Sequence, residues 1–157
     1  MLFSVSATTR RRREGEVHGK AYFFLTKEEF EQKISGNELV EWEQIYGNYY
    51  GTLKSEVDKT LSAGNSMLFD VDVKGALSIK KQYPDDAVLI FIEPPNLQIL
   101  TERLTNRKTE DAETIRKRLD RVPMEMEKGK EFDFRVVNDQ LPKAIQDVDT
   151  IICDALE

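Results

Sequence analysis

The segment from Phe3 to Tyr22 concentrates side chains that bind phosphate. It contains several Ser and Thr hydroxyls, the consecutive arginines Arg10 to Arg13, the carboxylate of Glu16 and the phenol of Tyr22. Arginine forks match pairs of phosphate oxygens, hydroxyls complete the oxygen shell, and a nearby carboxylate holds the arginines in place. The segment therefore predicts a site for a phosphorylated small molecule. The alternative is a solvated, disordered basic N-terminus.

A second segment, Glu41 to Thr52, brings a carboxylate and an aromatic doublet together in an expected hairpin with a turn at Gly47-Asn48. A purine base needs a flat stacking surface and acceptors for its ring N–H and amino hydrogens. Glu41 would suit guanine, whose N1–H and 2-amino group lie side by side. The alternative is that the aromatic residues pack within a sheet and Glu41 faces water.

The third segment is Asp70-Val71-Asp72, which follows an expected buried strand over 67–72. Ligands of open parallel sheets bind beyond the carboxyl ends of the strands. Alternation in a strand would direct both carboxylates to one side, where they could hold hydrated magnesium or accept hydrogen bonds. The alternative is that Asp70 caps the next helix and Asp72 is solvated.

Arginines recur on two expected helices, at Arg103, Arg107, Arg116 and Arg118. The spacing of Arg103 and Arg107 places both on one helical face. Such arginines could neutralise the charge that develops on a transferring phosphoryl group. The alternative is a solvated surface paired with neighbouring acidic residues.

The element pattern changes near residue 53. Before it, a strand at 2–6, a helix at 26–35 opened by a Thr26 and Glu29 capping box, and the hairpin form a small mixed unit. After it, helices near 54–63 and 74–82 alternate with strands at 67–72 and 87–92, which is typical of a parallel sheet covered on both faces. Helices near 97–107 and 111–128, a strand at 132–138 and a helix at 141–156 complete the chain.

Composition narrows the class of protein. A chain of 157 residues suits one compact domain, and its net charge of -6 argues against a nucleic-acid binder. The single cysteine, Cys153, and the single histidine, His18, exclude an internal disulfide framework and a multi-histidine metal site. No apolar run approaches a membrane span and no signal peptide is evident, so we expect a cytoplasmic protein without a membrane partner. The oligomeric state is not predicted.

A phosphoryl-transfer enzyme of this architecture should also carry a Walker A loop of pattern G-x-x-x-x-G-K-[ST], whose backbone N–H groups cradle the donor phosphates. The nearest string, Gly15 to Lys20, has one residue too few between its glycines and lacks the final hydroxyl residue. The sequence therefore contains no Walker A loop.

Taken together, the segments closely resemble guanylate kinase, the nucleoside monophosphate kinase family that transfers a phosphoryl group from ATP to GMP. The resemblance extends from Phe3 nearly to the C-terminus. Its most specific strings are Phe3 to Arg10 with Gly15-Glu16-Val17 and Tyr22, Gly47 to Thr52, Asp70 to Asp72 with Gly75, Phe91-Ile92 with Pro94-Pro95, Arg103-Leu104 with Arg107, and Val136 to Asp139.

The resemblance implies roles for individual residues. The guanine edge would be read by Ser6, Glu41, Thr52 and Asp72. The GMP phosphate would be held by Arg10, Arg13, Tyr22 and Tyr50, with Glu16 supporting the arginines. Phosphoryl transfer from ATP with Mg²⁺ would involve Asp70, through magnesium-bound water, together with Arg107 and Arg118, and Arg103 is a further candidate for the lid.

The fold implied is a single α/β domain over 1–157 with the P-loop nucleoside monophosphate kinase core and its parallel sheet. A small mixed α/β GMP-binding insertion would span 5–53, the core 54–99 and 129–157, and a helical lid 100–128. The family's first strand, P-loop and first helix would lie before Phe3 and are missing, so we expect GMP binding with impaired ATP binding.

Two further departures from the family concern loops. Arg11-Arg12 replaces a proline-containing stretch, which should leave that loop less rigid, and Lys108 replaces a lid glycine. The alternative function is a catalytically inactive guanylate kinase-like protein-interaction module. The retained carboxylates and arginines favour an enzyme, since a scaffold has no use for them.

Overall fold

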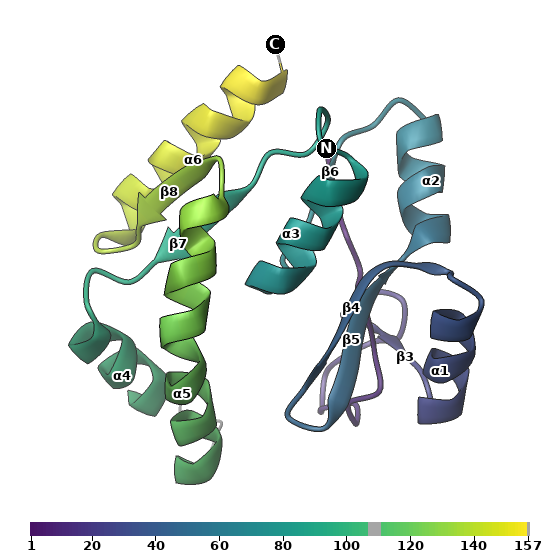
Figure 1. Cartoon of the computed structure of the whole chain (residues 1–157), viewed down its shortest axis with the longest axis horizontal. Helices are drawn as coiled ribbons and strands as arrows, with labels where there is room; N and C mark the ends of the chain where they lie inside the picture. Colours follow the sequence, from purple (N-terminus) through teal and green to yellow (C-terminus); the bar gives the residue numbers. More distant parts are fainter. Residues whose placement is uncertain (107–110, 157) are drawn as a thin grey trace. The chain divides into compact units, whose positions relative to one another are not determined.

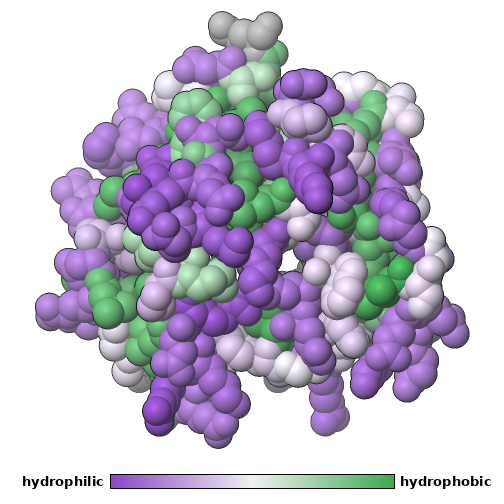
Figure 2. Space-filling view, viewed as in Figure 1, coloured by the Kyte–Doolittle hydropathy of each residue, from purple (hydrophilic) through white to green (hydrophobic). Residues whose placement is uncertain are grey.

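The computed structural model describes residues 1–106 and 111–156, which divide into two compact units, Met1–Asp85 and Asp86–Glu157. Each unit is described by itself (Figure 1). Hydrophilic residues cover most of the face seen in Figure 2, in keeping with a charged content of 33%. No helix within the described residues combines the length and apolar character that crossing a membrane requires.

The first unit contains a four-stranded mixed sheet with the order β3-β2-β5-β4. Its strands are β2 (Ala7–Thr8), β3 (Phe23–Phe24), β4 (Leu39–Ile45) and β5 (Asn48–Leu53). The expected hairpin is confirmed, but its turn lies at Tyr46-Gly47, because these residues take the positive φ angles of 52° and 82°. Two positive φ angles in a two-residue loop match the twist of paired strands.

Helix α1 (Lys27–Ser35) packs beside this hairpin (Figure 1). The predicted capping box is confirmed: the Thr26 hydroxyl accepts from the Glu29 N–H at 3.2 Å and the Glu29 carboxylate accepts from the Thr26 N–H at 2.7 Å. The fully buried Phe30 of α1 stacks on Tyr49 with 5.2 Å between ring centroids. Gly51 permits this packing, because a Cβ there would lie 3.1 Å from the Phe30 ring and 2.7 Å from the Glu41 carbonyl oxygen.

A parallel pair of short strands, β1 (Leu2–Phe3) and β6 (Met67–Leu68), completes the strands of this unit. Helix α2 (Lys54–Ser62) follows the hairpin, and α3 (Val73–Gln82) follows β6. Of the strand expected over 2–6, only Leu2–Phe3 forms, as β1, and β2 begins beyond it at Ala7, while the strand expected over 67–72 ends at Leu68. The reason for the second difference is that Asp72 already belongs to α3 as its N-cap.

The second unit is built on a parallel pair, β7 (Ile90–Glu93) and β8 (Phe134–Val137). Both strands are shorter than predicted, and β7 starts three residues later than expected because the Leu89 N–H is bonded to the Asp133 carboxylate instead of to a strand. The remaining elements are α4 (Leu97–Asn106), α5 (Ala112–Lys128), the 3₁₀ turn η1 (Gly129–Glu131) and α6 (Leu141–Leu156). The predicted helices 97–107, 111–128 and 141–156 thus agree with α4, α5 and α6 wherever the structure describes them.

Candidate functional site

A β-bulge decides which face of the hairpin carries Glu41. Leu39 pairs with Leu53, but the next pair along β4 is Glu41 with Thr52, so Val40 is the extra residue. Without the bulge, strand alternation would place Glu41 on the same face as Leu39, which lies in the apolar core with Phe30. The bulge therefore turns Glu41 away from that core and toward α3.

Glu41 is buried and hydrogen-bonded. It is 8% exposed, and its Oε1 accepts a hydrogen bond from the Thr52 hydroxyl at 2.7 Å. Burial raises the pKa of Glu41 to about 7, with smaller contributions in the same direction from the charges of Asp72 and Glu43, while the Thr52 hydrogen bond opposes the shift. A buried carboxyl of this kind is an acceptor suited to a ligand N–H donor.

The first turn of α3 brings a second carboxylate to Glu41. Asp72 is the N-cap of α3, and its Oδ1 accepts from the Gly75 N–H at 2.9 Å. A Cβ at Gly75 would lie 2.7 Å from Glu41 Oε2 and 3.2 Å from Asp72 Oδ1. Glu41 and Asp72 therefore flank one glycine, and two acceptor groups converge at this point.

This geometry corrects the interpretation of Asp70-Val71-Asp72. The two aspartates are not an alternating pair at a strand end, because β6 ends at Leu68. Asp72 caps α3, where the alternative had assigned Asp70, and Asp70 is exposed in the loop before the helix. Among residues 1–106 and 111–156, no group of three or more His, Cys, Asp or Glu could hold a metal ion.

The loop that carries Arg10 to Arg13 is attached to β5 by two threonine hydroxyls. Thr8 donates to the Tyr49 carbonyl at 2.9 Å, and the Thr9 hydroxyl accepts from the Tyr49 N–H at 2.9 Å. The Arg10 N–H in turn donates to the Thr8 hydroxyl at 3.1 Å. The hydroxyls near Arg10 therefore position the loop that carries the arginines.

Glu16 organises this loop from the other side. Its Oε1 lies 2.6 Å from a guanidinium nitrogen of Arg10, and its Oε2 accepts from the Arg13 backbone N–H at 2.7 Å. The hydrogen bond with Glu16 raises the pKa of Arg10, and the same bond, followed by that from Arg13, lowers the pKa of Glu16. The expected supporting role of Glu16 agrees with these contacts. The side chain of Arg13 is exposed.

Two tyrosines stand beside Arg10. Its guanidinium carbon lies 5.3 Å from the centroid of the Tyr22 ring, and Tyr22 contacts Tyr50 edge to face at 6.3 Å. The structure thus brings Arg10, Tyr22 and Tyr50 together.

Ser6 is half-buried in the link between β1 and β2. Its backbone carbonyl accepts from the Phe23 N–H at 2.9 Å.

Strand β5 joins the acidic and basic groups. Tyr50 pairs with Thr8 of β2, while Thr52 pairs with Glu41 of β4. Residues two apart in a strand share a face and are separated by roughly 7 Å. A face that offers acceptors at one end and an arginine with tyrosines at the other can bind a base with adjacent N–H donors and a monophosphate.

The arginines predicted to act in catalysis belong to the second unit. Arg118 is half-buried on α5, and Arg107 lies outside the described residues. Arg103 donates to the carbonyl oxygens of Asn138 at 2.7 Å and Asp139 at 3.3 Å, so in this structure it joins α4 to the end of β8. Their catalytic roles stay predictions.

Two contacts that support the site were not predicted from the sequence. Lys74 of α3 lies 2.7 Å from Glu43, and His18 accepts at Nδ1 from the Phe24 N–H at 3.2 Å, which fixes the loop between Glu16 and β3. The spacing of Glu41 and Glu43 on one strand could have indicated a second acidic residue on the same face. Nothing local in the sequence indicates the contact of Glu43 with Lys74.

Comparison with known proteins gives a consistent result. The family model described as guanylate kinase matches residues 1–155. A protein named guanylate kinase from Chlorobaculum tepidum is 47% identical over 154 residues, covering 98% of this chain and 79% of the relative. One of the same name from Porphyromonas gingivalis is 47% identical over 147 residues, covering 93% and 78%.

The fold is similar to a solved structure as well. The crystal structure of guanylate kinase from Anaplasma phagocytophilum matches with a TM-score of 0.79 and 28% identity, covering 99% of this chain and 77% of that one. Family model, relatives and fold agree, and the chain therefore belongs to the guanylate kinase family of phosphoryl-transfer enzymes.

Proposed function

We propose that residues 6–75 bind GMP as the phosphoryl acceptor of an ATP-dependent guanylate kinase reaction. The observation that carries the proposal is the convergence of Glu41 and Asp72 on Gly75, with Glu41 on the same sheet as β2, the strand that leads to Arg10. Guanine presents N1–H and the 2-amino group side by side, and Glu41 would accept from both when ionised. Thr52, which already donates to Glu41 at 2.7 Å, fixes the orientation of that carboxylate. Asp72 and Ser6 complete the recognition of the base.

The GMP phosphate would bind at the other end of this face, where Arg10 lies. Arg10 is already oriented by Glu16 and lies over Tyr22, so its fork would lose little freedom on binding a phosphate. Tyr22 and Tyr50 would donate their hydroxyls to the remaining oxygens, and the exposed Arg13 would add a second cation. Arginine with phosphate is among the stronger charge-assisted pairs.

For the transfer step we assign electrostatic roles. Arg107 and Arg118 would neutralise charge on the transferring phosphoryl group, for which catalysis is mostly positioning and electrostatics. Mg²⁺ commonly keeps several waters and binds one or two carboxylates together with substrate phosphates, and the exposed Asp70 fits that use. With ATP, the metal would neutralise phosphate charge. The products would be ADP and GDP, within purine nucleotide metabolism in the cytoplasm.

Donor binding by these 157 residues alone is expected to be weak, because they contain no G-x-x-x-x-G-K-[ST] pattern. A Walker A loop normally supplies the backbone N–H groups that surround the donor phosphates. GMP recognition depends on other residues and should be retained.

Calorimetric titration of the 157-residue protein with GMP, AMP and an ATP analogue tests both parts of the proposal. We expect saturable binding of GMP, binding of AMP weaker by at least tenfold, and little heat with the ATP analogue. Equal affinity for GMP and AMP would contradict the guanine site. Rapid ATP-dependent conversion of GMP would contradict the weak donor binding and leave the acceptor site intact.

A further inference from the structure

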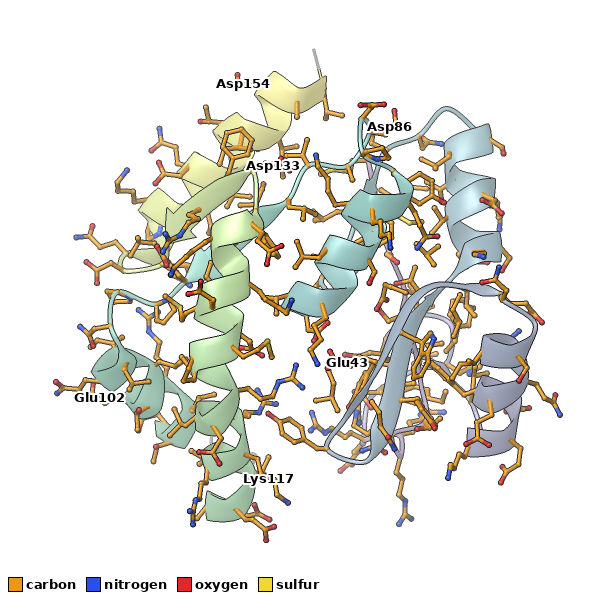
Figure 3. All side chains as sticks on the ribbon, in the orientation of Figure 1. Glu43, Asp86, Glu102, Lys117, Asp133 and Asp154 are labelled. Carbon is orange, nitrogen blue, oxygen red and sulfur yellow. The ribbon has the colours of Figure 1, made fainter. Side chains whose placement is uncertain are left out.

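We propose that Lys74 is a positioning residue of the guanine site, which through its ion pair with Glu43 holds β4 on the first turn of α3. The inference rests on the proposed function, since the groups that it positions are those assigned to guanine. Glu43 projects from β4 toward α3 (Figure 3), and its Oε1 lies 2.7 Å from Lys74 Nζ. Lys74 lies between Asp72 and Gly75 in the chain, so the pair acts directly on the turn where the two carboxylates meet.

Helix α3 is hydrogen-bonded to β4 at two points, one near each end of the helix. The close approach of Gly75 to Glu41 lies between these two points. Lys74, near the start of the helix, bonds to Glu43, and the Gln82 side-chain amide, at its end, donates to the Val40 carbonyl. Glu41 lies between Val40 and Glu43 on the strand, and Gly75 lies between Lys74 and Gln82 on the helix. The two attachments therefore enclose the close approach of Gly75 to Glu41.

Glu43 lies near other acidic groups, so its contact with α3 is stabilised by a cation. Glu41, Glu43 and Asp72 are three acidic groups near one another, and the charges of both Glu43 and Asp72 disfavour the ionised form of Glu41. Tyr50 is the cross-strand neighbour of Glu43. The Lys74 ammonium forms an ion pair with Glu43. Its positive charge offsets part of the repulsion among the three carboxylates.

The exposure of the pair indicates where its effect should be seen. The side chain of Lys74 is 49% exposed and that of Glu43 is 15% exposed. Ion pairs this close to solvent contribute little to global stability. Displacement of a recognition group by about 1 Å, in contrast, can greatly reduce the interactions that depend on its position. Loss of the pair should therefore affect nucleotide selectivity more than unfolding temperature.

The test compares GMP with IMP, which has the same phosphate and the same N1–H but lacks the 2-amino group. We expect Lys74→Gln to lower the affinity for GMP about tenfold and that for IMP about threefold or less. Because both ligands carry the same charge, a purely electrostatic effect of Lys74 would lower both affinities equally. Lys74→Arg should retain the wild-type ratio, and Lys81→Gln, an exposed lysine of the same helix, should change neither affinity.

Three results would overturn the inference: equal losses for GMP and IMP, unchanged affinities, or failure of Lys74→Arg to restore selectivity. A double-mutant cycle with Glu43→Gln adds a second test, because the double variant should lose no more selectivity than Lys74→Gln alone, and additive losses would contradict a pair. If the wild-type protein binds neither nucleotide, the proposed function fails. If it binds GMP and Lys74→Gln behaves like wild type, only the positioning role fails.

Discussion

The base end and the phosphate end of the candidate site are built in opposite ways. At the base end, Glu41 is 8% exposed and burial raises its pKa, so the protein disfavours the charge of this carboxyl. At the phosphate end, Arg10 and Glu16 are paired near solvent, and their hydrogen bond favours both charges. A buried acceptor gives selectivity, because a wrong base leaves it unsatisfied, whereas a prepared cation gives affinity for any monophosphate.

The largest expected effect concerns the phosphate end. Arg10→Gln should lower the affinity for GMP, IMP and AMP alike by about a hundredfold or more, since hydrogen bonds to charged groups contribute about 1.5–3 kcal/mol each. Guanosine, which lacks the phosphate, should bind as it does to wild type. Calorimetric titration measures all four. Arg11→Gln is the matched control, because the Arg11 residue is exposed and the variant keeps the backbone carbonyl that accepts from Arg10. A selective loss of GMP would contradict the division between the two ends.

The base end should give the opposite pattern. Glu41→Gln is expected to lower the affinity for GMP by about a hundredfold, equivalent to about 3 kcal/mol, because an amide cannot accept from both guanine donors. The affinity for AMP should change by less than threefold. Competition titrations with both nucleotides measure the ratio. A parallel loss of AMP would mean that the substitution disturbs the hairpin and does not act on recognition.

Much of this first unit could be predicted from local sequence, because local contacts build it. The Thr26 and Glu29 capping box, the hairpin and the arginine with its supporting Glu16 lie within a few residues of one another along the chain. The bulge at Val40 was not predicted, since two consecutive apolar residues, Leu39 and Val40, are equally typical of a strand buried on both faces. The contact of Lys74 with Glu43 spans 31 positions and depends on how α3 packs.

The strand ends were the least predictable part, because competing interactions decide them. Asp72 could continue a strand or cap a helix, and the hydrogen bond to the Gly75 N–H selects the cap. The same uncertainty affects the second unit, where Arg103 follows the expected helical spacing and yet donates to backbone carbonyls at the end of β8. Spacing places an arginine on a helix face but does not identify its partner.

The raised pKa of Glu41 predicts how the stability of the free protein depends on pH. The folded-state pKa of about 7 exceeds the ordinary value of 4.5, so the folded state binds more protons between these values. Glu41 therefore costs stability as pH rises from about 4.5 to 7. At about 1.4 kcal/mol per pKa unit, we expect Glu41→Gln to be relatively more stable at pH 8 than at pH 5 by roughly 2 kcal/mol. Urea unfolding of both proteins at both pH values measures the free energies of unfolding. If the free energy of the variant relative to wild type is the same at pH 5 and pH 8, Glu41 is not a buried, uncharged carboxyl.

The smallest effect separates the position of Glu41 from its chemistry. A Cβ at Gly75 would lie 2.7 Å from Glu41 Oε2, so Gly75→Ala should displace that carboxylate while leaving its charge and the phosphate end unchanged. Alanine favours a helix over glycine by about 0.5–1 kcal/mol, which offsets part of the cost of displacing the buried carboxylate, so the unfolding temperature should change little. GMP affinity should nevertheless fall about tenfold and AMP affinity should stay constant. Ser78→Ala, on an exposed position of the same helix, controls for helix propensity. Retained GMP affinity in Gly75→Ala would show that the base end tolerates displacement, and the selectivity attributed to the convergence of Glu41 and Asp72 would then have to arise elsewhere.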